Sequence, residues 1–179
     1  MSAKFADLPE TQRQKLIQQF HLNFDFWSEP VVDEIKIIFM DIFGDEPEIA
    51  YSVGGSCDYA ATSGNIKYKK GFMEKIVRNY SPDTELMKIA TDWRNLQRKN
   101  FYALTAKLTL GKTCTICTVY DERHHHGWST NEQESDVSEV VADFNHWAMK
   151  KIQGELEFQT SMESIESFYE GQEFEIEED

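Results

Sequence analysis

The chain has 179 residues and a mass of 20.9 kDa, which suits one domain of ordinary size. Hydrophobic residues make up 40% of it, so a wholly disordered chain is excluded, and a net charge of −14 disfavours direct nucleic-acid binding. No run of about 18 apolar residues predicts a membrane span, no signal peptide is visible, and the three cysteines do not resemble a secreted disulfide framework, so we expect an intracellular protein.

The first half of the chain predicts two helices and then two strands. Apolar residues recur at helical spacing over residues 10–22 and again from Pro30 until Gly44. Residues 48–53 and 60–68 predict strands joined by a turn, because Gly54 and Gly55 allow a tight reversal and Asp58 can accept hydrogen bonds from nearby amides. We expect these three turn residues, Gly54, Gly55 and Asp58, to shape the backbone and not to catalyse.

The middle of the chain repeats this order of helices and strands. Residues 72–80 predict a short helix, and a longer helix follows Pro82. Residues 101–110 and 113–120 predict two strands joined by a hairpin at Gly111-Lys112. Four aromatic residues fall on the apolar stripes and are expected in the core: Trp93, Phe101, Phe144 and Trp147.

The last third predicts a polar loop over residues 121–135 and a helix over 136–170 that is broken or kinked near Gly154. Residues 173–176 alternate charged and apolar side chains and can add one edge strand. The whole order predicts a single α+β domain over residues 1–179. Its sheet is mainly antiparallel and built from two hairpins plus this C-terminal edge strand, with helices covering one face.

Charge is strongly segregated along the chain. The segment Lys67–Lys112 holds 11 of the 18 basic residues against four acids, whereas ten acids and no base follow Lys151. Two interpretations are open. The acidic end can pack on the basic segment, within one chain or across a homodimer, or it can be presented to a basic partner as a nucleic-acid mimic would be. Eight large apolar residues in 155–179 predict that this acidic end is folded, with its apolar face packed.

Cysteine and histidine residues invite a metal-site interpretation that their spacing disfavours. Cys114 and Cys117 have CxxC spacing and precede His124, His125 and His126. Within a strand, residues three apart point to opposite faces, so we expect two structural cysteines, no zinc and no cofactor. The turn at Gly54–Asp58 lacks the lysine and the following helix of a phosphate-binding loop. No catalytic motif supports an enzyme.

Short motifs spread over most of the chain resemble those of one family. The clearest is Leu96-Gln-Arg98 followed by Phe101-Tyr102. The others are Phe5-Ala-Asp-Leu8, Ile49-Ala-Tyr-Ser52, Asp58 with Ala60 and Gly64, Tyr68-Lys-Lys-Gly71, Phe144-Asn-His-Trp147 and Glu173-Phe-Glu175. The chain resembles a family of small acidic tailed-phage proteins labelled "antitoxin of toxin–antitoxin stability system". The family has glycines beside the acid of its turn, where this chain has Cys57 and Tyr59.

The resemblance implies a phage-encoded protein that binds and neutralises another protein in the cytoplasm of a bacterial host. We therefore expect a non-enzymatic binding protein, either antitoxin-like or an inhibitor of host defence such as an anti-CRISPR or anti-restriction protein. Its expected binding face is acidic and consists of Glu163, Glu166, Glu170 and Glu173, and its expected partner is the basic surface of a toxin or defence protein. An enzyme acting on a small molecule or nucleotide signal at Gly54–Asp58 is the alternative. A nucleic-acid binder using Lys67–Lys112 is a third hypothesis.

Overall fold

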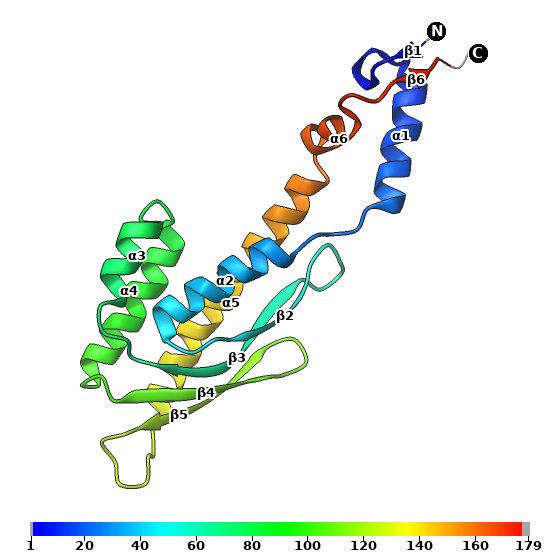
Figure 1. Cartoon of the computed structure of the whole chain (residues 1–179). Coiled ribbons are helices and arrows are strands. Elements are labelled where there is room, and N and C mark those ends of the chain that lie inside the picture. The colour runs from blue at the N-terminus through cyan, green and yellow to red at the C-terminus, as the bar shows by residue number, and fades with distance from the viewer. Residues whose placement is uncertain (1, 177–179) are drawn as a thin grey trace. The chain divides into compact units, whose positions relative to one another are not determined.

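The elements of the computed structural model follow the α+β order that the sequence predicts, and the model describes residues 2–176 (Figure 1). Contacts between Cα atoms divide these residues into two compact units. The larger unit is Glu29–Gln153, and the smaller unit combines the described residues up to Ser28 with those from Gly154 onward. Each unit has buried apolar residues of its own, and the prediction of one domain over residues 1–179 stays a prediction.

The larger unit is built on a four-stranded antiparallel sheet with the strand order β2-β3-β4-β5. The strands are β2 (Glu48–Ser52), β3 (Tyr59–Lys67), β4 (Leu104–Leu110) and β5 (Thr115–Asp121). The helices are α2 (Glu29–Phe43), α3 (Phe72–Tyr80), α4 (Thr84–Lys99) and the part of α5 (Asn131–Gln159) that ends at residue 153. Figure 1 shows the helices of this unit on one side of the sheet, so the predicted class and its helix-covered face are confirmed.

Alternating burial along β4 identifies the covered face. Leu104, Ala106 and Leu108 are buried, whereas Thr105 and Lys107 between them are partly or fully exposed. A period of two is what one covered and one open face produce. The covered face meets an aromatic core from α2, α4 and α5 that consists of Phe39, Phe43, Trp93, Phe144 and Trp147.

Three of the four aromatic residues predicted to lie in the core are buried, and the fourth is not. Trp93, Phe144 and Trp147 expose at most 2% of their surface, whereas Phe101 exposes 75%. The prediction for Phe101 is wrong because β4 begins at Leu104 and not at residue 101. Phe101 and Tyr102 instead have φ angles of +55° and +62°, and the Tyr102 amide donates to the Gln97 carbonyl at 2.6 Å. These two residues reverse the chain between α4 and β4.

The long C-terminal helix also differs from the prediction at both of its boundaries. Helix α5 begins at Asn131, five residues before the predicted start, because Thr130 and Gln133 form reciprocal bonds between side chain and backbone amide. The helix then runs through Gly154 without a break and ends at Gln159. A new helix, α6 (Met162–Tyr169), starts where the Ser161 hydroxyl accepts a hydrogen bond from the Ser164 amide.

The smaller unit has a separate core around α6. Its other elements are β1 (Ser2–Ala3), the 3₁₀ helix η1 (Phe5–Asp7), α1 (Glu10–Asn23), β6 (Phe174–Glu175) and the end of α5. Phe5, Leu8, Ile165 and Tyr169 are buried together, and the Phe5 and Tyr169 rings are stacked with centroids 5.0 Å apart. The predicted C-terminal strand forms, but β6 pairs with β1 in a two-stranded sheet and is not an edge strand of the four-stranded sheet.

Between residues 2 and 176, none of the helices combines the length and the apolar composition that a membrane crossing requires.

Candidate functional site

The acidic surface, defined here as Glu163, Glu166, Glu170 and Glu173, lies in the smaller unit. Glu163 and Glu166 are spaced three apart in α6, so they lie on one side of that helix, and Glu170 is the residue that directly follows its end. All four side chains are exposed. Glu173 lies further along, between α6 and β6.

The other side of α6 holds this surface in place. Ile165 and Tyr169 expose 1% and 8% of their surface and pack with Phe5 and Leu8. The Tyr169 hydroxyl also donates to the Leu16 carbonyl at 3.1 Å. The acidic end is therefore folded, as predicted, as far as residue 176, and the carboxylates of the acidic surface are exposed. Its last three acids, Glu177, Glu178 and Asp179, lie outside the described residues.

Three of the four predicted carboxylates surround one hollow. A cavity of about 430 Å³ is lined by Glu163, Glu166 and Glu170 together with Lys4 and Phe5. Glu173 does not line it. The hollow thus places three carboxylates beside the Phe5 and Tyr169 side chains and the ammonium group of Lys4, an arrangement that can accept a further cationic group.

The expected packing of the acidic end is only partly correct. Ile165 and Tyr169 are buried, but Phe158, Met162 and Phe168 expose 56%, 46% and 59% of their surface. The smaller unit also exposes Leu22 and Trp27, by 84% and 64%. Apolar and acidic side chains thus share the surface of this unit.

Charge is divided between the units much as it is along the sequence. Residues 1–28 and 154–179 contain 13 of the 32 acids and three of the 18 bases. In the larger unit, lysines of the basic segment form ion pairs with acids between residues 41 and 143: Lys67 with Asp45, Lys75 with Asp41, Lys88 with Asp92 and Asp143, and Lys99 with Glu132. These lysines therefore have partners without the C-terminal carboxylates.

The turn at Gly54–Asp58 has the predicted local structure. Gly54 has a φ angle of +77°, which favours glycine, and the Asp58 carboxylate accepts a hydrogen bond from the Gly55 amide at 3.1 Å. Asp58 thus closes the turn that precedes β3, and Cys57 beside it is exposed.

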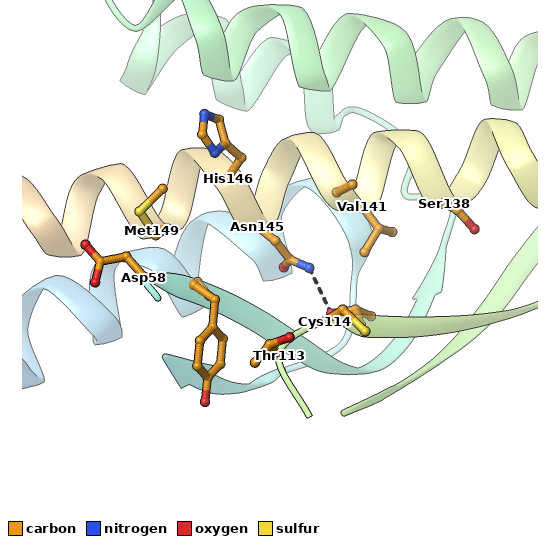
Figure 2. Close-up of a pocket in the computed structure, with 12 residues that line it drawn as sticks. Asp58, Thr113, Cys114, Ser138, Val141, Asn145, His146 and Met149 are labelled. Carbon is orange, nitrogen blue, oxygen red and sulfur yellow. Dashed lines mark hydrogen bonds between the residues drawn. The ribbon is translucent and has the colours of Figure 1, made fainter. Parts of the chain in front are cut away.

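Asp58 also lies at a pocket that sequence reasoning missed. The pocket has a volume of about 280 Å³ and lies between this turn, the start of β5 and helix α5. Asn145 points from α5 toward the strands, where its amide donates to the Thr115 hydroxyl at 2.8 Å (Figure 2). Its carbonyl accepts from the Thr62 hydroxyl at 3.0 Å. Both polar atoms of the Asn145 side chain therefore join α5 to the sheet.

The pocket brings a thiol and an imidazole to one region without pairing them. Cys114 and His146 both line it, but Figure 2 shows the His146 ring on the side of α5 that faces away from Cys114. A nucleophile and its base must lie within hydrogen-bond reach for the thiolate to be activated. The arrangement gives no direct support to covalent catalysis by Cys114.

The two cysteines of the CxxC motif are placed differently from the prediction. Strand β5 begins at Thr115, so Cys114 lies in the preceding turn and is exposed, while Cys117 in the strand is half-buried. Burial raises the pKa of the Cys117 thiol. Among residues 2–176, no group of three or more His, Cys, Asp or Glu side chains is arranged to hold a metal ion.

A buried polar cluster near the end of β5 also escaped the sequence analysis. Asp121 is fully buried and forms an ion pair with Arg123, and Gln133 donates to both Asp121 and Asn100 at 2.8 Å. Hydrogen bonds from Arg123, followed by the bond from Gln133, hold the pKa of Asp121 well below its usual range. The cluster joins β5, its following loop, α4 and α5, which are distant in sequence.

A family model described as a domain of unknown function, DUF8835, matches residues 27–162. The matched range contains the whole larger unit, with its sheet and the Asp58 pocket, and ends just before the acidic surface. No curated protein and no solved structure matches the chain.

Proposed function

We propose that this chain, which belongs to the DUF8835 family of domains of unknown function, is a non-enzymatic protein that binds and neutralises another protein. The proposed partner is a toxin or a host defence protein with a basic surface. In this proposal the protein is phage-encoded and acts in the cytoplasm of the bacterial host, as an antitoxin or as an anti-CRISPR or anti-restriction inhibitor.

One observation carries the proposal. The exposed carboxylates of Glu163 and Glu166 on α6, and of Glu170 directly after it, line a single hollow, and the opposite side of the same helix is anchored in the core of the smaller unit. Carboxylates held on a folded helix lose little conformational freedom on binding, so they can complement the charges of a basic partner at a low entropic cost. Exposed Met162 and Phe168 on the same helix supply apolar area beside the charges.

The experiment compares the intact chain with the variant Glu163→Gln, Glu166→Gln, Glu170→Gln and Glu173→Gln. Each chain is immobilised and exposed to a lysate of a bacterial host, and the retained protein is identified, purified and tested for binding and inhibition. We expect the neutralised variant to bind this protein more weakly. Binding by the intact chain should fall with added salt, because exposed charges are screened over about 8 Å at physiological ionic strength.

A matched control removes the same number of charges from helices of the larger unit, through Glu29→Gln, Glu34→Gln, Glu74→Gln and Glu139→Gln. These carboxylates are also exposed. We expect this control to retain binding, and circular dichroism establishes that both variants are folded. Equal binding by the intact chain and the α6 variant at low salt would show that the binding face lies elsewhere.

The alternative function is an enzyme acting on a small molecule or nucleotide signal, and the 280 Å³ pocket beside Asp58 is the observation that favours it. A hydrolytic activity that Asp58→Asn abolishes in a folded protein would establish this alternative. Under the binding proposal, Asp58→Asn leaves inhibition of the partner unchanged.

A further inference from the structure

A row of side chains crosses the open face of the four-stranded sheet near one end. Strand register pairs Lys67 of β3 with Thr105 of β4, and Thr105 with Tyr120 of β5. Beyond β5, an isolated antiparallel bridge joins Tyr120 to Trp128. Because directly opposite residues in antiparallel strands point to the same face, these four side chains lie side by side on that face. Tyr120 and Trp128 expose 43% and 74% of their surface.

A second row lies next to the first on the same face. It contains Asn65, Lys107 and Thr118, which are paired in register and exposed. The two rows together define the aromatic sheet face: Asn65, Lys67, Thr105, Lys107, Thr118, Tyr120 and Trp128. This surface has two adjacent aromatic rings, two lysines and three neutral polar side chains, and its strands contribute no acid to it.

Trp128 is held against the sheet although it lies outside the named strands. The Asp121 amide donates to the Gly127 carbonyl at 3.2 Å, and the Ser129 hydroxyl donates to the Val119 carbonyl at 3.0 Å. Gly127 has a φ angle of +68°, which turns the chain back along β5. The loop is also tied down where Arg123 pairs with the buried Asp121. The indole is thus presented by an ordered backbone.

The larger unit, which carries this face, is less acidic than the chain as a whole. The net charge of −14 is that of the whole chain, and it disfavours binding of nucleic acid. The larger unit, however, contains 15 of the 18 bases against 19 acids. Within the face itself the charged side chains are Lys67 and Lys107. Asp45 pairs with Lys67 at 3.2 Å, and Glu46 and Glu48 line a hollow together with Asn65 and Lys107. Glu48 belongs to β2, at the opposite edge of the sheet from β5, where Tyr120 and Trp128 lie.

We propose that the aromatic sheet face binds a single-stranded nucleic acid. Tyr120 and Trp128 stack on successive bases, since every base has a flat face that an aromatic ring can cover. Lys67 and Lys107 contact the phosphates, while Asn65 and Thr118 offer hydrogen-bond partners to base edges. This surface belongs to the larger unit and is independent of the acidic surface, so either proposal can fail without the other.

The test measures the anisotropy of a fluorescein-labelled 20-nucleotide oligothymidine, and of its RNA counterpart, titrated with the full chain at low salt. We expect saturable binding of at least one of the two oligonucleotides. Trp128→Ala and Tyr120→Ala should each weaken it by about fivefold or more, the range measured for loss of one stacked base. Lys107→Gln should reduce the slope of log affinity against log salt by about 0.7.

Trp27→Ala is the matched control, because Trp27 is a similarly exposed tryptophan in the smaller unit. It should bind as the intact chain does, and circular dichroism establishes that all variants are folded. The proposal is overturned if neither oligonucleotide binds at low salt, or if Trp128→Ala and Trp27→Ala bind equally well. It is also overturned if sedimentation finds a dimer that Trp128→Ala dissociates while oligonucleotide affinity is unchanged, since the face would then join two copies of the chain.

Discussion

At the scale of single residues, burial separates aromatic side chains that the sequence treats alike. Trp147 packs against Phe144 with ring centroids 5.3 Å apart, and its indole donates to the Asp83 carboxylate at 2.9 Å. Phe101 instead lies on the surface beneath the Arg123 guanidinium, 5.4 Å from the ring centroid. The two residues therefore have different energetic roles.

Replacement of Trp147 by alanine should lower the free energy of unfolding by about 3–5 kcal/mol, because it removes a large buried side chain and leaves a cavity. The same replacement at Phe101 should cost about 1 kcal/mol or less, since that ring is mostly exposed. Chemical denaturation followed by circular dichroism measures both values. Similar losses in the two variants would contradict the placement of Phe101 on the surface.

Asp121 links the stability of the larger unit to pH. Its pKa is lowered in the folded state by hydrogen bonds from Arg123, so the folded chain binds this proton less readily than the unfolded chain. The resulting stabilisation is complete at neutral pH and is lost as the pH falls below about 4, the ordinary range of an aspartate. Asp121→Asn should lower the denaturation midpoint at pH 7 and flatten its decline toward acid.

Glu132→Gln is the control for this prediction. Glu132 pairs with Lys99 on the surface, where its side chain is 72% exposed, and such pairs contribute little to stability. We expect its acid profile to follow that of the intact chain. A profile for Asp121→Asn that also follows the intact chain would mean that other carboxylates control the acid transition.

At the scale of elements, capping residues set the helix boundaries that apolar periodicity misses. The segment Thr130-Asn-Glu-Gln133 is a capping box readable in the sequence, and it starts α5 before the apolar stripe begins. Ser161 similarly starts α6 and ends the apparent continuity of the helical pattern. Gly154 fits inside α5 because helical φ and ψ angles are open to glycine, at a modest cost in stability.

The Ser161 cap should matter for the acidic surface. Ser161→Ala removes the acceptor for the Ser164 amide and should cost about 1 kcal/mol of stability in the smaller unit, whereas Ser161→Asp should retain it. Hydrogen exchange of the α6 amides measures the local effect. Ser167→Ala, an exposed position inside the same helix, is the control, and equal protection in Ser161→Ala and Ser167→Ala would argue against the cap.

At the scale of the whole molecule, charge segregation is the feature with the most direct functional meaning. The smaller unit carries most of the excess negative charge, and the larger unit carries most of the bases together with the acids that pair with them. The net charge is −10 in the smaller unit and −4 in the larger unit, so the acidic character is concentrated in the smaller one. The acidic surface lies in the smaller unit and the aromatic sheet face in the larger unit.

Metal content is a property of the whole chain that tests the interpretation of its cysteines. Cys114 lies in an exposed turn and Cys117 in a strand, so their thiols do not share the tight turn on which a CxxC zinc chelate usually forms. Elemental analysis of untagged, desalted protein should find far less than one zinc per chain. One zinc per chain, lost on replacement of both cysteines by serine, would contradict this prediction.

The sequence by itself determined the α+β class, the order of helices and strands and the turn at Gly54–Asp58, because these depend on periodicity and on local backbone preferences. It also located the exposed acids of the acidic surface, since charged residues remain in water unless they are paired. Tertiary structure decided what depends on pairing between distant segments. Strand register placed Trp128 beside Tyr120, β6 joined β1 at the opposite end of the sequence, and Phe101 was turned out of the core. Such contacts arise from packing across the chain, which no local pattern encodes.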